Sequence, residues 1–322
     1  MRGPLATDRI AVSKQWTYII AAPRTRLTPL LRAENVMIAN SKNTMCIYHA
    51  NCADGFGAAW VVRKALGPEV EFHPASHGHL PPDVTGKTVV IVDFAYPYEA
   101  LMAMAAVADS ILVLDHHKTA QADLARVPAA GSFGQPLNHG NVHAVFDMNR
   151  SGAGLTWDYF FPSQPRPALI NHIEDRDLWR FKLEGTREVL ANLFSYPQDF
   201  AVWDELFAAE VSSLLADGVA IERQRQKTVA DLVRSTQRRM VIGGHDVPVA
   251  NIPAMFASDA GHVMTEGEPF AACYSDGPKG RSFSLRSTDQ GVDVSEVAGQ
   301  YGGGGHRNAS GFRVPFGHEL CR

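Results

Sequence analysis

Two short apolar runs, each with a carboxylate at or near its end, constrain the fold of this chain more than any other feature. Residues 88–94 read Thr-Val-Val-Ile-Val-Asp-Phe, and residues 110–115 read Ser-Ile-Leu-Val-Leu-Asp. Neither run alternates apolar with polar residues, so a strand formed by it would be buried on both faces. Residues 98–108, rich in Ala, Met and Leu, predict a helix between them. Such strands alternating with helices predict a parallel sheet covered on both sides.

Other segments extend this pattern along the chain. Further strands are predicted at 45–48, 70–72 and 142–146, with a helix at 55–66. Helices then predominate, and they are predicted at 154–161, 168–179, 188–194 and 201–208. A charged stretch with a helical apolar period and no Gly or Pro, 219–239, predicts a linker helix. The last strands are predicted at 247–250, 270–274, 283–286 and 311–314.

We therefore predict an α/β protein in four parts. A poorly structured extension covers 1–44, and a parallel-sheet domain with flanking helices covers 45–208. A linker helix covers 209–239, and a smaller α/β domain covers 240–318. The first forty residues hold six basic and two acidic side chains. A targeting segment has that composition, but a poorly ordered tail, or a start at Met37 or Met45, is our preferred interpretation.

Composition limits the classes of function. The net charge of −4 argues against a wholly basic surface for long duplex nucleic acid, although a local basic cleft for a short anion is compatible with it. No apolar run is long enough to span a bilayer, so no membrane partner is expected. The four cysteines form no CxxC pair, which is typical of a reducing compartment and predicts a cytoplasmic location.

Polar side chains follow three of the predicted strands. The first strand leads into His49 and then Asp54, the third ends at Asp93, and the fourth ends at Asp115-His116-His117. The carboxyl ends of parallel strands face one crevice, and these oxygen and nitrogen donors suit Mn²⁺, Mg²⁺ or Zn²⁺. Two such ions about 3.5–4 Å apart activate water for phosphoryl displacement. A single Asp after a strand is often a helix cap, so the combination carries the inference.

This combination resembles the DHH phosphoesterase superfamily, which includes RecJ-type exonucleases, nanoRNases and family II inorganic pyrophosphatases. The resemblance rests on Asp115-His116-His117, on Asp93 one strand earlier, and on Asp54-Gly55 in the first loop. It implies a site for two metal ions, typically Mn²⁺, with Mg²⁺ or Co²⁺ as alternatives. By position, Asp93 resembles the bridging carboxylate, and His49, Asp54 and His116 resemble metal ligands. Asp115 and His117 would shape the site or contact phosphate.

Two positions of this pattern are less well determined. The family has a further aspartate on a later helix, for which Asp175 fits best by its spacing and Asp177 is the alternative. The first loop departs from the family, because Cys52 occupies a place where a second aspartate is common. A thiolate there would favour a softer ion than Mn²⁺, so Cys52 is interpreted as a residue near the site and not as a firm ligand.

A glycine-rich motif lies near the C-terminus. Gly302 to Gly305 precede His306, and successive glycines let backbone N–H groups face an anion. Arg286 could add a bidentate phosphate contact. The order Gly-rich run, His306, Ala-Ser-Gly resembles the DHHA1 domain, whose motif binds the phosphate of the substrate. By that resemblance Gly303, Gly304, Gly305, His306, Arg286 and His117 would contact substrate. The likeness covers roughly residues 45–316.

Together these resemblances imply a metal-dependent, exonuclease-like phosphoesterase acting on short nucleotide substrates. Oligoribonucleotides, linear dinucleotides and 3′-phosphoadenosine 5′-phosphate are the candidates, and the lack of an evident basic and aromatic track in the sequence agrees with a short ligand. The alternatives are a nucleotide-binding regulatory protein with a degraded metal site, and a phosphoesterase with a non-nucleotide substrate. A homodimer is compatible with the sequence.

Overall fold

The computed structural model describes residues 43–133 and 140–322 of the chain. The predicted N-terminal extension, 1–44, therefore falls outside the described residues except for its last two positions. Within the described ranges, no helix combines the length and the apolar character that crossing a bilayer demands.

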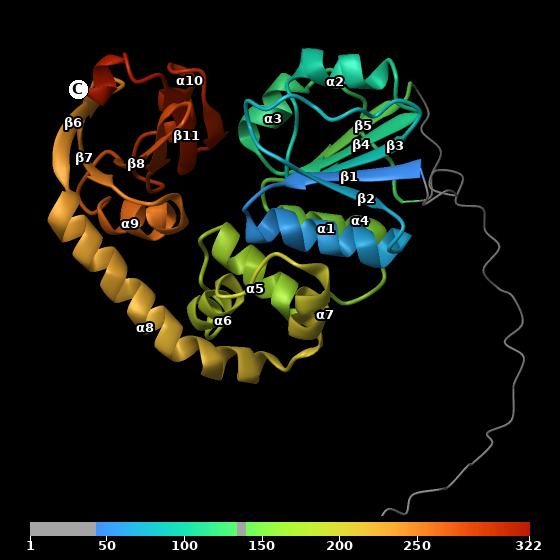
Figure 1. Ribbon diagram of the computed structural model, residues 1–322, viewed down its shortest axis with the longest axis horizontal. Helices are drawn as coiled ribbons and strands as arrows, with labels where there is room; N and C mark the ends of the chain where they lie inside the picture. The colour runs from blue at the N-terminus through green and yellow to red at the C-terminus, as the bar shows by residue number, and fades with distance from the viewer. Residues whose placement is uncertain (1–42, 134–139) are drawn as a thin grey trace, which may run out of the picture. The chain divides into compact units, whose positions relative to one another are not determined.

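The first sheet is parallel throughout, as the doubly apolar runs predict (Figure 1). Its five strands lie in the order β2-β1-β3-β4-β5. Their bounds are β1 Thr44–His49, β2 Glu71–Ala75, β3 Thr88–Val92, β4 Ser110–Asp115 and β5 Val142–Phe146. Ile91 of β3 pairs in register with Ile47 of β1 and with Val113 of β4. The three central strands are thus aligned so that their carboxyl ends reach one edge of the sheet.

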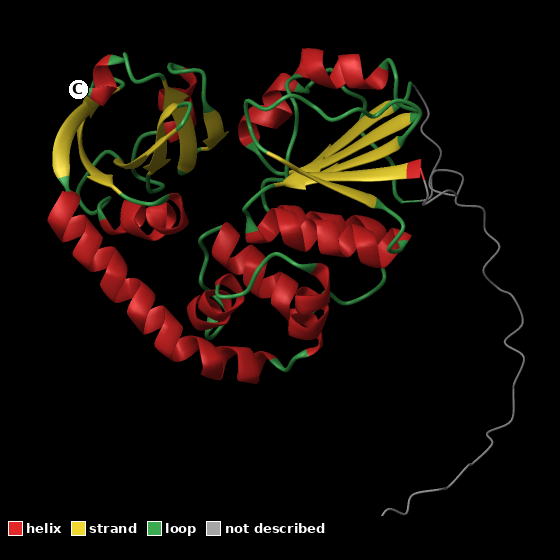
Figure 2. Cartoon of the chain, in the orientation of Figure 1, coloured by secondary structure: helices red, strands yellow, loops and turns green. Residues whose placement is uncertain are grey.

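Helices cover both faces of this sheet, which explains why its strands lack polar alternation (Figure 2). Val90 and Leu112 pack in one core with α1 (Ala53–Leu66) and α4 (Gly152–Phe160). Their neighbours Val89 and Ile111 pack in a second core with α2 (Tyr98–Ala105), and the short α3 (Lys118–Asp123) lies on the same side (Figure 1). Successive residues of a strand therefore pack into opposite cores.

A helical region follows, comprising α5 (Ala168–Asp177), α6 (Thr186–Phe194) and α7 (Phe200–Ala208). It joins the first core through Trp203, whose ring centroid lies 4.8 Å from that of Phe56. The next helix, α8 (Val211–Thr236), begins eight residues before the apolar period predicts. It continues through Gly218, where a Cβ would overlap the carbonyl oxygen of Glu188. Glycine is required there because α8 and α6 approach each other closely, and not because the helix ends.

The second sheet has six strands in the order β10-β11-β9-β8-β7-β6. All neighbours are antiparallel except β7 and β8. The bounds are β6 Arg238–Ile242, β7 His245–Asn251, β8 Ala271–Gly277, β9 Gly280–Arg286, β10 Gly304–His306 and β11 Ala309–Val314. Two helices, α9 (Ala257–Val263) and α10 (Val294–Gly299), and the single turns η2 (Ala254–Phe256) and η3 (Glu319–Cys321) complete the chain.

The four strands predicted in this region are present, but β6 and β10 were not predicted. The predicted linker helix includes Arg238 and Arg239, but α8 ends at Thr236, three residues before the predicted end at 239. An edge strand with exposed arginines lacks the apolar signal that marks the interior strands. β10 consists of glycines and His306, so it has no side-chain pattern to read. The four-part division of the chain stays a prediction.

Candidate active site

The order of the first sheet creates a crevice at the carboxyl ends of β1 and β3. These strands are neighbours, but the chain continues from β1 to β2 on one side and from β3 to β4 on the other. Loops that leave in opposite directions open a crevice, and ligands of open α/β sheets bind at that place. His49 ends β1, Asp54 lies in the first turn of α1, and Asp93 follows β3. Three predicted site residues therefore surround the crevice.

Asp93 is held at the centre of this crevice by a strained backbone. Its φ is +52°, which is uncommon for a residue with a Cβ and is found often at functional sites. Its Oδ1 lies 3.0 Å from His116 Nε2, and its Oδ2 lies 3.5 Å from His49 Nδ1. Burial tends to raise the pKa of Asp93, but the contacts with His116 and His49 hold it well below the usual range. Asp93 is thus an ionised carboxylate between two imidazoles.

Asp54 approaches the same imidazole from the start of α1. Its Oδ2 lies 3.7 Å from His116 Nε2 and accepts a hydrogen bond from the Gly152 N–H. Its Oδ1 accepts a hydrogen bond from the Ala153 N–H. Burial and the charge of Asp93 raise the pKa of Asp54 well above its usual value. Gly152 makes this convergence sterically feasible, because a Cβ there would lie 2.8 Å from Asp93 Oδ1 and 2.9 Å from Asp54 Oδ2.

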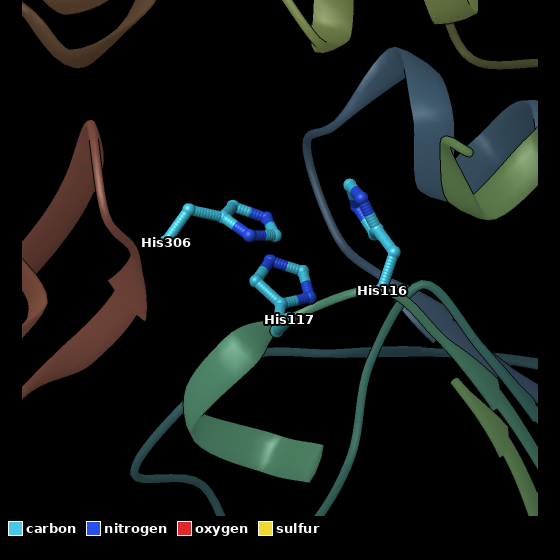
Figure 3. A group of neighbouring side chains, drawn as sticks. All are labelled: His116, His117 and His306. Atoms are coloured by element: carbon cyan, nitrogen blue, oxygen red, sulfur yellow. The ribbon is translucent and has the colours of Figure 1, made fainter. Parts of the chain in front are cut away.

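The two imidazoles of the Asp-His-His motif at the end of β4 make different contacts. Asp115 is fully buried, and its Oδ1 accepts from the His116 N–H at 2.8 Å and lies 2.7 Å from His117 Nδ1. That contact orients His117 and leaves its Nε2 free to face the cleft. The His117 ring lies 4.6 Å from the ring of His306, and His116 lies 4.7 Å from it (Figure 3). The motif therefore meets the glycine-rich loop.

The structure places Asp175 and Asp177, the two candidates for the later carboxylate, in different surroundings. Asp175 turns away from the crevice, and its oxygens accept from the N–H groups of Lys182 and Leu183 and from Thr186 Oγ1, at 2.6–3.0 Å. It stabilises the turn after α5. Asp177 Oδ2 instead lies 3.7 Å from His116 Nε2 and lines the cleft. Position in the helix alone could not distinguish them, because the chain that follows α5 turns back onto Asp175.

Two further side chains lie at the edge of the cluster. Cys52 lines the cleft beside the carboxylates, and burial, with the charge of Asp93, raises the pKa of its thiol well above the usual value. His77 was not predicted, because the strand expected at 70–72 extends to Ala75 as β2 and so ends only two residues before His77. Its ring lies 4.8 Å from that of Phe94 and 5.6 Å from that of His49. Burial, and the nearby imidazole of His49, lower the pKa of His77 to about 4.

The glycine-rich loop contacts the residues that follow the Asp-His-His motif. The Gly305 N–H donates to Thr119 Oγ1 at 3.1 Å, and the Gly303 N–H donates to the carbonyl oxygen of Ala298 at 2.9 Å. Both N–H groups are therefore bonded within the protein. A Cβ at Gly304 would lie 2.9 Å from Thr119 Oγ1. The glycines instead allow a close approach that brings His306 to the crevice.

Arg286, also predicted to contact substrate, lines the same cleft, whose volume is about 2270 Å³. Its Nη2 donates to Ser258 Oγ at 2.7 Å. Burial lowers the pKa of Arg286 to about 10, so the guanidinium is charged at neutral pH. The pKa of His306 is lowered to about 3 by burial and by His117, so this imidazole is neutral there.

The donors around His116 fit a divalent cation. Asp54, Asp93 and Asp177 each place an oxygen within 3.7 Å of one nitrogen, so three carboxylates of like charge converge on one point and repel each other. In the described part of the chain, Asp93 Oδ2 and Asp115 Oδ2 are buried without a hydrogen-bond donor. Asp54, Asp93 and His116 form one group of potential ligands, and His49, Asp93 and His117 form another. Asp93 belongs to both, as a carboxylate between two ions would.

Comparisons with known proteins bear on this site. No family model matches the sequence. An uncharacterized protein of Acanthamoeba polyphaga mimivirus is 31% identical over an alignment 307 residues long, which covers 86% of this chain and 69% of that protein. The parallel sheet, the Asp-His-His motif at the end of β4 and the converging carboxylates define a phosphoester hydrolase. The chain belongs to the DHH superfamily of phosphoesterases.

Other similar proteins carry names that describe their activity. The oligoribonuclease NrnB of Bacillus subtilis is 26% identical over an alignment 310 residues long, which covers 83% of this chain and 72% of that protein. Among solved structures, RecJ of Thermus thermophilus in complex with Mn²⁺ has a TM-score of 0.45 at 15% identity, over 85% of this chain and 50% of that one. The pGpG-specific phosphodiesterase PggH from Vibrio cholerae has a TM-score of 0.44 at 13% identity, over 85% and 94% of the two chains.

Proposed function

We propose that this protein hydrolyses phosphodiester or phosphomonoester bonds of short nucleotide substrates. One observation carries the proposal: the imidazole of His306 stacks on His117, next to the carboxylates around His116. An imidazole that can donate to a substrate phosphate is thereby placed next to a group of potential metal ligands. The similarity to an oligoribonuclease of Bacillus subtilis supports nucleotides as the substrate class.

The residues proposed to hold two divalent cations are His49, Asp54, Asp93, His116 and Asp177. Asp93 would contact both ions, because its two oxygens face His116 and His49 separately. The oxygen-rich donor set favours Mn²⁺, with Mg²⁺ or Co²⁺ as alternatives. Bound ions of this kind lower the pKa of water and stabilise the charge that develops on the phosphoryl group.

The other side chains would bind and orient the phosphate. His117 has its Nδ1 fixed by Asp115, which leaves Nε2 to meet a phosphate oxygen. The neutral His306 can donate one ring N–H to the same phosphate without adding charge. Arg286 supplies a guanidinium farther along the cleft. Substrate bound between these groups would be held from both sides.

Hydrolysis of a substrate panel with added Mn²⁺ tests this proposal. The panel contains p-nitrophenyl thymidine phosphate, di- to pentaribonucleotides, linear dinucleotides and 3′-phosphoadenosine 5′-phosphate. We expect turnover of the oligoribonucleotides, and loss of both turnover and bound manganese in Asp93→Ala. Asp217→Ala is the matched control, because Asp217 is exposed on α8. A protein that turns over none of the nucleotides would refute the proposal, and a metal content near zero in the wild type would favour a degraded site.

A further inference from the structure

Three arginines from three different helices meet at one buried carboxylate in the described chain. Asp259 of α9 is 5% exposed. Arg225 of α8 contacts its Oδ2 through Nη2 at 2.7 Å and through Nε at 2.9 Å. Arg176 of α5 donates to both of its oxygens at 3.3 Å, and Arg187 of α6 lies 3.8 Å from Oδ1. We call Arg176, Arg187, Arg225 and Asp259 the arginine cluster.

The arginine cluster carries more positive than negative charge. Three guanidinium groups share the single charge of Asp259, and the side chains of Arg176 and Arg225 are each only 14% exposed. Two other carboxylates act on them: Asp177, which the proposed metal ions would neutralise, and Glu222, whose pKa is raised by burial. No ion pair within 4.0 Å joins Glu222 to an arginine among the described residues, and its Oε1 accepts from a glutamine instead. An anionic ligand would therefore offset charge that the protein leaves in excess.

The arginine cluster lies along the same cleft as the carboxylates around His116. Arg176 directly precedes Asp177 on α5, and both line the cleft, as does Arg225. The Arg286 guanidinium donates to Ser258, the residue before Asp259. Cationic groups thus continue from the proposed phosphate site at Arg286 to the arginine cluster. A chain of phosphates is a ligand that matches such a row.

Aromatic rings alternate with these guanidinium groups. The Arg176 guanidinium lies 4.5 Å from the ring of Trp179, and that of Arg225 lies 5.5 Å from the ring of Phe194, which is 41% exposed. Trp179 has a φ of +54° and stacks on His262 at 3.7 Å. A strained backbone thus presents an indole in the cleft. Cationic groups interleaved with ring faces are typical of proteins that bind single-stranded nucleic acid.

We propose that the arginine cluster is a second phosphate subsite, which holds a phosphate of a single-stranded oligonucleotide beyond the one being cleaved. Phe194, which is 41% exposed, would offer a ring face to one of its bases, and Trp179 would support the Arg176 guanidinium. This inference rests on the proposed function and narrows its substrate class. Oligoribonucleotides with several phosphodiesters would bind better than compounds with a single phosphate.

The test compares a triribonucleotide with p-nitrophenyl thymidine phosphate, which has one phosphate, using the full chain with Mn²⁺. In Arg225→Gln we expect KM for the triribonucleotide to rise about tenfold, as the loss of a hydrogen bond to a charged group implies. KM for the one-phosphate substrate should stay at the wild-type value. Arg234→Gln is the control, because Arg234 lies on the same helix and its side chain is 77% exposed. Arg225→Lys should recover part of the loss.

Salt dependence gives a readout that a purely structural role would not change. Each phosphate contact on a single strand contributes about 0.7 to the slope of log affinity against log salt concentration, so Arg225→Gln should reduce the slope by about that amount. Asp259→Asn should tighten triribonucleotide binding, since the ligand then meets more unneutralised charge. Equal losses on both substrates, an unchanged KM in Arg225→Gln, or weaker binding in Asp259→Asn would each overturn the inference.

A binding measurement separates this inference from the proposed function. Fluorescence anisotropy of a labelled triribonucleotide with Asp93→Ala needs no turnover. The Kd should rise about tenfold when Arg225→Gln is added to that variant. A wild-type protein without turnover refutes the hydrolytic function, whereas an unchanged Kd on losing Arg225 refutes the subsite.

Discussion

Replacing Asp175 by asparagine should destabilise the fold, whereas the same change at Asp177 should impair metal binding. The two carboxylates are two positions apart on α5 but have opposite surroundings. Asp175 is 5% exposed and accepts three hydrogen bonds that fix the turn after the helix. Asp177 faces His116 and two other carboxylates. A single pair of isosteric variants therefore tests whether the structure assigns the two residues correctly.

The contacts of Asp175 determine how much stability the Asp175→Asn variant should lose. Its Oδ1 accepts from the Lys182 N–H, and its Oδ2 accepts from the Leu183 N–H and from Thr186. Asparagine has only one acceptor oxygen, so at least one of these donors would face an NH₂ group, and the other bonds would lose their charge. Hydrogen bonds to a charged group contribute about 1.5–3 kcal/mol each, which gives a decrease of about 2–4 kcal/mol in the free energy of unfolding.

The same contacts make the stability that Asp175 contributes depend on pH. Burial tends to raise the pKa of Asp175, but the hydrogen bonds from Thr186, Lys182 and Leu183 exceed that effect and lower it. A group with a lowered folded pKa contributes stability that is complete above its unfolded pKa of about 3.9 and is lost as the pH falls through the folded value. The difference in the free energy of unfolding between the wild type and Asp175→Asn should therefore become smaller at acidic pH.

Asp177→Asn should behave in the opposite way. Burial, and the nearby charge of Asp93, raise the pKa of Asp177, so a neutral amide relieves repulsion in the metal-free protein. Stability without metal should not fall. A metal at a hundred times its Kd stabilises a folded protein by about 2.7 kcal/mol, and this variant should lose most of that gain.

Urea unfolding with and without Mn²⁺, together with metal analysis, measures both effects. The reasoning fails if Asp175→Asn keeps its stability but loses metal. It fails equally if Asp177→Asn unfolds more readily without metal and responds to Mn²⁺ as the wild type does.

Three further substitutions test the site. Gly152→Ala should cost about 1–3 kcal/mol and reduce bound manganese, because its Cβ would crowd Asp93, while Gly299→Ala, whose Cβ meets nothing within 4 Å, should do neither. His306→Ala should raise KM about tenfold and keep the metal, and a collapse of metal content would contradict the role of the loop. The activity of the wild-type protein between pH 6 and 8 should show no titration of His306, because that imidazole has a pKa of about 3. Cys52→Asp should tighten binding of the second manganese in calorimetry, and an unchanged affinity would count against Cys52 as a missing carboxylate.

Much of the first sheet was predictable because its strands are buried on both faces. The apolar runs at 88–94 and 110–115 became β3 and β4 at nearly the expected bounds. Their carboxyl ends had to meet at one edge, so the proximity of Asp93 to His116 followed from the parallel order. The second sheet was less predictable, because its edge strands β6 and β10 have no apolar pattern.

What the sequence could not supply was the direction of individual side chains. The choice between Asp175 and Asp177 depends on where α5 ends and on the positive φ of Trp179, which turns the chain back. The arginine cluster was missed for another reason, since its members span residues 176–259 and no local window contains them. The sequence shows no basic and aromatic track, but the fold assembles one.

The contacts beside the Asp-His-His motif bear on how such proteins can be recombined. Thr119 accepts from Gly305, and Lys118 pairs with Asp293 at 2.7 Å. The two residues that follow His117 thus belong structurally to the C-terminal half as much as to the first sheet. A chimera that exchanges this half between relatives would need to carry positions 118 and 119 with it. The unit of exchange in this architecture is the C-terminal sheet together with that short piece of α3.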